Sequence, residues 1–282
     1  MRKTVSIADF LVGGDTFVVM AGPCAVESKE QLFAAADSVA AAGAAMLRGG
    51  AYKPRTSPKS FQGLGPTGLD FLLQASQRTG LPVVTEVLDP RDVERVAQHA
   101  AMLQVGSRNM QNFPLLREVG RQRLPVLLKR GAAATVDELL YAAEYITNEG
   151  NGNVLLCERG IRSFDHATRY VLDLAVVPLL RERCEFPIIV DPSHGTGRTS
   201  LVRPMALAAA AAGADGLLIE VHAEPHKALC DGMQALLPAD FVQMMVDLRR
   251  LLPMLGRRLV RPGVSGHGAA ANGTISDEFI AP

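Results

Sequence analysis

Eight short apolar runs alternate along this chain with longer segments of helical periodicity. Most runs are apolar at every position rather than at every second one, which is typical of parallel strands buried on both faces. The runs predict eight strands, at residues 17–21, 45–48, 83–87, 102–105, 126–129, 154–157, 188–191 and 216–221.

The intervening segments predict helices, and the clearest is 135–148, which opens with the capping-box sequence Thr-Val-Asp-Glu. The other predicted helices are 28–42, 69–78, 91–100, 114–121, 166–183, 203–212 and 240–255. Eight strand–helix pairs within about 250 residues predict an α/β fold, a single-domain (β/α)8 TIM barrel. A doubly wound open sheet is the alternative. It usually has a GxGxxG turn after its first strand, and none follows here.

The predicted domain plan is one catalytic barrel at 18–256, a short N-terminal extension at 1–17 and a Gly/Ala-rich C-terminal tail at 257–282. We expect this tail to be mobile, or to be ordered only against a neighbouring subunit. The longest non-helical connection, residues 49–68, is rich in Pro and Gly. A connection of that length inside a compact domain is usually functional.

Composition excludes several classes of partner. The 282 residues have a formal net charge of zero, so no overall field attracts nucleic acid or an anionic membrane. No stretch reaches the roughly 18 apolar residues of a membrane span, and no secretion signal precedes the first strand. We therefore expect a cytoplasmic protein. Its four cysteines lack CxxC spacing, which argues against a zinc knuckle and a disulfide framework.

Polar residues follow almost every predicted strand, at the barrel end where ligands bind in this fold. Cys24, His194, Glu220 and Asp231 offer one sulfur, one imidazole and two carboxylates. Taken singly, each has an ordinary structural explanation such as packing, capping or a salt bridge. Together they form a mixed donor set that suits one divalent first-row metal ion, such as Mn, Fe, Co or Zn.

The remaining strand-end residues are mainly basic. Gathered in one mouth, they would bind a small substrate with several negative charges, because Arg and Lys are the usual partners of phosphate and carboxylate. The basic residues are Arg48, Lys53, Arg55, Arg108, Lys129 and Arg159. Glu86 also ends a strand, and either a role near a reacting water or a salt bridge would explain it.

Seven segments in order resemble the 3-deoxy-7-phosphoheptulonate (DAHP) synthases, in particular the type Iβ branch of the superfamily they share with 3-deoxy-D-manno-octulosonate 8-phosphate (KDO8P) synthase. The segments are GPCAVES (22–28), LRGGAYKPRTSPKSFQGLG (47–65), GSRNMQNF (106–113), LLKRG (127–131), CERGIRSF (157–164), DPSHGTGR (191–198) and IEVHAEPHKALCDGMQAL (219–236). The resemblance spans about residues 18–255. It implies a transferase that condenses phosphoenolpyruvate with erythrose 4-phosphate, the first step of the shikimate pathway.

The resemblance also implies roles for individual residues. Cys24, His194, Glu220 and Asp231 would hold the metal ion. Arg48, Lys53, Arg108, Lys129 and Arg159 would contact phosphoenolpyruvate, and Arg55 and Thr56 would hold the phosphate of erythrose 4-phosphate. We take Lys53 as the candidate proton donor, so the catalytic residues would be Lys53, Cys24 and His194. Family members are commonly homodimers or homotetramers.

Three alternative functions remain open at the level of the sequence. A KDO8P synthase, which uses arabinose 5-phosphate, would carry an Asn-containing loop where this chain reads Lys53-Pro-Arg-Thr-Ser. A catalytically inactive barrel that binds phosphometabolites would not need the metal donors. A metal-dependent hydrolase would normally use several histidines. Because only about 17 residues precede the first strand, too few for a regulatory domain, we also expect little feedback inhibition by aromatic amino acids.

Overall fold

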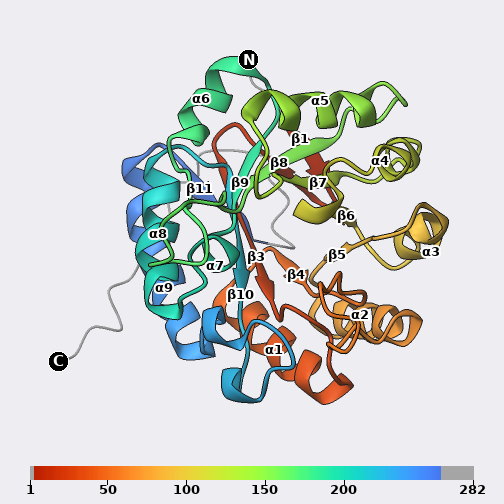
Figure 1. The fold of residues 1–282 in the computed structure, drawn as a ribbon. Helices are drawn as coiled ribbons and strands as arrows, with labels where there is room; N and C mark the ends of the chain where they lie inside the picture. Colours follow the sequence, from red (N-terminus) through yellow and green to blue (C-terminus); the bar gives the residue numbers. More distant parts are fainter. Residues whose placement is uncertain (1–2, 262–282) are drawn as a thin grey trace.

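The computed structural model describes residues 3–261, and within them eight parallel strands close into a barrel (Figure 1). The last strand pairs with the first, with Gly216 opposite Val18 and Glu220 opposite Gly22, which leaves no open edge. The strands are β3 (Thr16–Gly22), β4 (Met46–Arg48), β5 (Val83–Glu86), β6 (Met102–Val105), β7 (Val126–Lys129), β8 (Val154–Glu158), β9 (Ile188–Val190) and β10 (Gly216–Glu220). The predicted barrel is confirmed.

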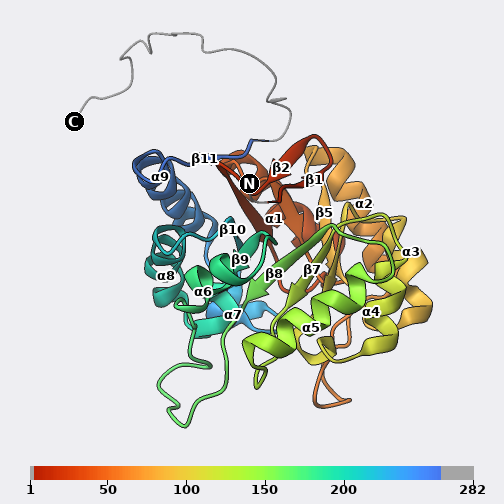
Figure 2. The ribbon, with the colours of Figure 1, turned by 90° about the horizontal axis from the view of Figure 1, so that it is seen from above.

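Helices surround the strands in both views (Figures 1 and 2). They are α1 (Lys29–Ala42), α2 (Pro66–Thr79), α3 (Val93–Ala97), α4 (Phe113–Gly120), α5 (Val136–Thr147), α6 (Val176–Arg183), α7 (Pro192–Thr196), α8 (Thr199–Ala211) and α9 (Pro238–Met254), with short 3-10 turns η1 (Pro90–Asp92), η2 (Ser107–Asn109), η3 (Pro225–Lys227) and η4 (Gly232–Gln234). The capping box before α5 is confirmed, because Thr135 and Glu138 each accept a hydrogen bond from the other's backbone N–H, at 3.2 and 2.7 Å.

Two helix predictions were wrong in extent. The segment 166–183 is helical only from Val176, because the Asp173 carboxylate accepts the Val176 N–H at 3.3 Å and starts α6 there. Residues 161–175 instead form a loop whose two sides join through an Ile161–Val171 backbone bridge. The segment 91–100 divides into the 3-10 turn η1 and the short helix α3.

Two large clusters make up most of the hydrophobic core. One fills the space between strands and helices, and the other, which includes Met20, Met46 and Leu155, fills the barrel interior. A hairpin that the sequence did not predict, β1 (Val5–Ile7) with β2 (Phe10–Val12), buries Val5 and Val12 against the interior cluster. The adjoining turn approaches Pro187, just before β9. The hairpin therefore covers the amino-terminal end of the barrel and leaves the mouth at the other end.

The chain returns to the barrel after α9. A two-residue strand, β11 (Arg258–Leu259), lies parallel to the start of β3. Residues 262–282, most of the predicted tail, lie outside the described residues. Within 3–261, none of the helices has the length and apolar character needed to cross a bilayer.

Candidate active site

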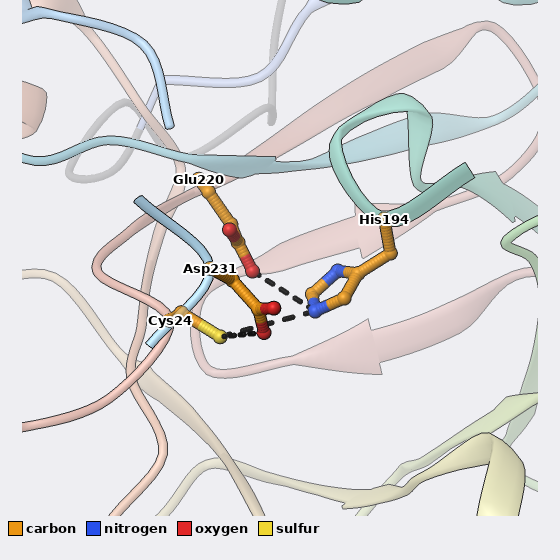
Figure 3. A group of neighbouring side chains, drawn as sticks. All are labelled: Cys24, His194, Glu220 and Asp231. Atoms are coloured by element: carbon orange, nitrogen blue, oxygen red, sulfur yellow. Dashed lines mark hydrogen bonds and ion pairs between the residues drawn. The ribbon is translucent and has the colours of Figure 1, made fainter. Parts of the chain in front are cut away.

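Four donor side chains converge at the carboxyl ends of the strands (Figure 3). Cys24 follows β3, His194 lies on α7, Glu220 ends β10 and Asp231 immediately precedes η4. One ligand atom of each lies within 4.8 Å of the others. His194 Nε2 is 2.9 Å from Glu220 Oε1, and Cys24 Sγ is 3.3 Å from Asp231 Oδ2 and 3.9 Å from His194 Nε2. The fold thus brings together the whole donor set expected from the sequence.

Asp191 orients His194. One of its carboxylate oxygens accepts the backbone N–H of His194 at 2.9 Å and caps α7, and the other contacts His194 Nδ1 at 2.7 Å. The second contact leaves Nε2 facing the other donors, an arrangement common among metal-bound histidines. Asp191 is the last residue of the predicted strand 188–191, and no role was predicted for it. Its three-residue spacing from His194, across a Pro at the first helical position, was the available signal.

Charges within the buried cluster compensate one another. Burial would lower the pKa of His194, but Asp191 and Glu220 raise it to about 9. Burial would raise the pKa of Glu220, but His194 and Arg48 hold it below its ordinary value. A hydrogen bond with Cys230 and burial both raise the pKa of the Cys24 thiol. A cation entering here would therefore displace protons from the imidazole and the thiol.

The donors fit a resident metal ion. Sulfur, imidazole and carboxylate oxygen in one buried cluster suit a borderline divalent first-row cation better than Mg²⁺ or Ca²⁺, which prefer oxygen alone. The convergence of all four ligand atoms is the observation that supports this fit.

A cavity of about 270 Å³ opens beside the donors. Two of the donors, His194 and Asp231, line it. So does every residue expected to bind an anionic substrate: Arg48, Lys53, Arg55, Thr56, Arg108, Lys129 and Arg159. One cavity therefore lies against both the donor cluster and a cationic wall, the name used here for Arg48, Lys53, Arg55, Arg108, Lys129 and Arg159.

The inner cations are tied to the donor cluster. Lys53 Nζ donates to Cys24 Sγ at 2.9 Å, Arg48 donates to Glu220 Oε1 at 3.3 Å, and Lys129 pairs with Asp191 at 2.5 Å. Burial would lower the pKa of Lys53, but Cys24, Cys230 and Glu86 raise it above its ordinary value, so the ammonium stays charged.

The outer cations keep donors for a ligand. Arg55 Nη1 is buried without a hydrogen-bond partner, and such a group is costly unless something binds it. Arg159 lies over the ring of Tyr170 at 4.3 Å. No ion pair is found for Arg55, Arg108 or Arg159 in the part of the chain that the structure describes. A second cavity, of about 400 Å³, adjoins the first and shares Arg108 and Arg159 with it.

Glu86 also lines the first cavity. Its Oε2 accepts from Gln104 Nε2 at 3.1 Å, and its Oε1 has no partner. Among residues 3–261 no salt bridge involves Glu86, so the structure does not support that explanation of it.

Besides Asp191, two residues that support the site were not predicted from the sequence. Arg169 lines the cavity and contacts both Asp231 and Gln234. Gln234 in turn contacts Glu220. Arg169 was missed because a helix was wrongly predicted over 166–183. Gln234 was missed because no local pattern distinguishes it from an ordinary loop residue.

Fold and site together define a (β/α)8-barrel protein in which four side chains that could hold a metal ion lie beside a cavity lined by cationic residues. The chain belongs to the DAHP synthetase I family, whose model matches residues 3–252.

Known relatives support this membership. The phospho-2-dehydro-3-deoxyheptonate aldolase of Thermotoga maritima is 48% identical over 252 residues, which cover 89% of this chain and 75% of that protein. A 2-dehydro-3-deoxyphosphooctonate aldolase of Syntrophotalea carbinolica is 32% identical over 262 residues, covering 86% of this chain and 93% of that protein.

Solved structures give the same result. The crystal structure of the Thermotoga maritima DAHP synthase superposes with a TM-score of 0.89 at 47% identity, covering 92% of this chain and 76% of that one. A truncated form of the 3-deoxy-D-arabino-heptulosonate 7-phosphate synthase from the same organism gives a TM-score of 0.86 at 43% identity, covering 92% and 95%.

Proposed function

We propose that this chain condenses phosphoenolpyruvate with D-erythrose 4-phosphate to give 3-deoxy-D-arabino-heptulosonate 7-phosphate and phosphate. The observation that carries the proposal is that His194 and Asp231, two of the four convergent donors, line the same cavity as the cationic residues. The greater identity to the heptonate enzyme, 48% against 32% for the octonate enzyme, favours erythrose 4-phosphate over arabinose 5-phosphate.

The cationic wall would bind both substrates. Arg48, Lys53, Arg108, Lys129 and Arg159 would hold the phosphate and carboxylate of phosphoenolpyruvate. Arg55, with its unpartnered Nη1, and Thr56 would hold the phosphate of the sugar. Holding both substrates at reacting distance can contribute about 7–11 kcal/mol to lowering the barrier.

Cys24, His194, Glu220 and Asp231 would hold one divalent cation, of which Mn, Fe, Co and Zn are the candidates. Once bound, the ion would act as a Lewis acid that polarises the aldehyde of the sugar phosphate.

Lys53 would provide the proton for bond formation. As carbon 3 of phosphoenolpyruvate attacks the aldehyde carbon, negative charge develops on the aldehyde oxygen. The Lys53 ammonium, 2.9 Å from Cys24 Sγ and buried at the cavity wall, is charged and can donate a proton there. Water then attacks carbon 2 and phosphate leaves by C–O cleavage, while Arg108, Lys129 and Arg159 stabilise the departing anion.

The cellular setting follows from the sequence and the family resemblance. We propose that the enzyme acts in the cytoplasm as a homodimer or homotetramer, and that its product enters aromatic amino acid biosynthesis.

A coupled assay tests the proposed reaction. Purified protein is incubated with phosphoenolpyruvate and erythrose 4-phosphate, and consumption of phosphoenolpyruvate and release of phosphate are followed together. We expect turnover that a chelator abolishes and added Mn²⁺ restores, and much weaker turnover with arabinose 5-phosphate. Preference for arabinose 5-phosphate would support the octulosonate reaction instead, and unchanged turnover in the chelator would exclude a metal role.

A further inference from the structure

The two carboxylate donors are each held from the side opposite the cluster. Glu220 directs Oε1 at His194 Nε2, while its Oε2 accepts from Gln234 Nε2 at 2.8 Å. Asp231 directs Oδ2 at Cys24, while its Oδ1 accepts from Arg169 Nη1 at 3.0 Å. Each carboxylate therefore has one oxygen inside the donor cluster and one engaged by a neighbouring side chain.

The two neighbouring side chains also contact each other. Arg169 Nη1 donates to Gln234 Oε1 at 2.8 Å. Because a guanidinium can only donate, the Gln234 amide must turn its oxygen to Arg169 and its NH₂ to Glu220. We call Arg169 and Gln234 the carboxylate clamp, since together they link Glu220 and Asp231 through a continuous set of hydrogen bonds.

Burial and charge make this clamp effective. Gln234 is 2% exposed and Glu220 1%, so their hydrogen bond lies in a low-dielectric environment where it is strong. The Arg169 charge offsets part of the repulsion between two neighbouring carboxylates. It also holds the side chain of Asp231, whose φ of 53° is unfavourable for a non-glycine residue and needs support from its surroundings.

The backbone leaves room for Arg169 to reach this position. A Cβ on Gly197 would lie 2.5 Å from Arg169 Cβ, and Gly197 itself has a φ of 68°. Glycine at 197 therefore satisfies both the left-handed backbone and the close approach of the arginine.

We propose that Arg169 and Gln234 are positioning residues of the metal site, which orient Glu220 Oε1 and Asp231 Oδ2 toward the cation before it binds. The inference rests on the proposed metal site and extends it to two residues that touch no ligand atom of the cluster. Removing partners that orient metal ligands typically weakens metal affinity about 10–100-fold.

The experiment measures Mn²⁺ affinity by calorimetry on metal-stripped protein. Gln234→Met removes the amide at nearly constant volume, and Gln234→Glu keeps an acceptor for Arg169 but loses the donor to Glu220. Arg169→Gln removes the charge, and Arg169→Lys retains it without the planar fork. Arg203→Gln is the matched control, because Arg203 pairs with Asp247 on the helical surface at 2.5 Å.

We expect the Mn²⁺ Kd to rise about 10–100-fold in Gln234→Met and Arg169→Gln. Arg169→Lys should lose less Mn²⁺ affinity than Arg169→Gln. Arg203→Gln should bind Mn²⁺ as tightly as the unaltered protein. Gln234 does not line the substrate cavity. The KM for phosphoenolpyruvate of Gln234→Met at saturating Mn²⁺ should therefore remain within about twofold of the unaltered value.

The outcomes separate the two proposals. If the unaltered protein binds no Mn²⁺, the metal site itself is refuted. If it binds Mn²⁺ and both clamp variants bind equally well, the positioning role is refuted. A KM that rises in step with Kd in Gln234→Met would indicate general distortion of the barrel mouth and would also overturn the inference.

Discussion

Replacing Arg130 by Met should destabilise the barrel, because it breaks a buried ion pair from one side. Arg130 Nη1 donates to Glu158 Oε2 and to Asp173 Oδ2, both at 3.0 Å. The Glu158 side chain is fully buried, whereas that of Asp173 is 28% exposed. Loss of the arginine therefore leaves one buried carboxylate without a countercharge, while Asp173 can turn to water.

The expected loss of folding stability can be estimated from the contacts that Glu158 would keep. Breaking a buried pair typically costs about 3–5 kcal/mol. Glu158 would keep the backbone N–H of Gly160, at 2.6 Å, and the weaker N–H of Asp173, at 3.4 Å. Because these hydrogen bonds still stabilise the anion, we expect a loss near the lower limit, about 3 kcal/mol.

The loss should depend on pH. Burial already raises the pKa of Glu158 above 4.5, and Arg130 opposes that rise. Without Arg130 the folded-state pKa rises further above the unfolded value. A carboxyl raised in this way stabilises the fold most at low pH and loses that contribution as pH rises through its folded pKa. The deficit of Arg130→Met should thus be smaller at about pH 5 than at about pH 8.

Urea unfolding at both pH values measures this loss, from the transition midpoint at an unchanged slope. Arg91→Met is the matched control, since the Arg91–Asp89 pair lies at the surface, where solvent screens an ion pair and leaves it little effect on stability. Adding Glu158→Gln to Arg130→Met removes the unpaired charge and should recover part of the loss. Unfolding of Arg130→Met at the same urea concentration as Arg91→Met would contradict the predicted loss of stability.

Two further predictions address the substrate pocket and the local fold. Arg55→Ala should raise the KM for erythrose 4-phosphate about 10–100-fold, the effect of losing a charged hydrogen bond of about 1.5–3 kcal/mol, and leave the KM for phosphoenolpyruvate nearly unchanged. Steady-state kinetics with each substrate varied in turn would check this, and equal rises in both values would contradict it. Thr135→Ala should lower the free energy of unfolding by about 1 kcal/mol, because the α5 capping box is lost. Urea unfolding measures this change. Stability unchanged from that of the unaltered protein would show that the cap is dispensable.

Local sequence determined the strands and most helices. Continuous apolar runs identified all eight barrel strands, and the Thr135–Glu138 capping box marked the start of α5, because both signals depend on residues close together along the chain. Local motifs also identified the residues of the donor cluster and the cationic wall. Their positions at or after the carboxyl ends of strands were sufficient to group them, because in a parallel barrel all of these ends lie at one mouth.

Only the tertiary structure decided how the site is supported. Cys24 and Asp231 are 207 positions apart and meet because β10 pairs with β3. The sequence predicted a helix at Arg169, because the segment 166–183 has helical periodicity. Contacts far away in sequence, Arg130 with Asp173 and Arg169 with Asp231, instead hold residues 161–175 as a loop. Pairings between distant segments leave no local pattern, so the carboxylate clamp could be recognised only once the barrel had brought its residues together.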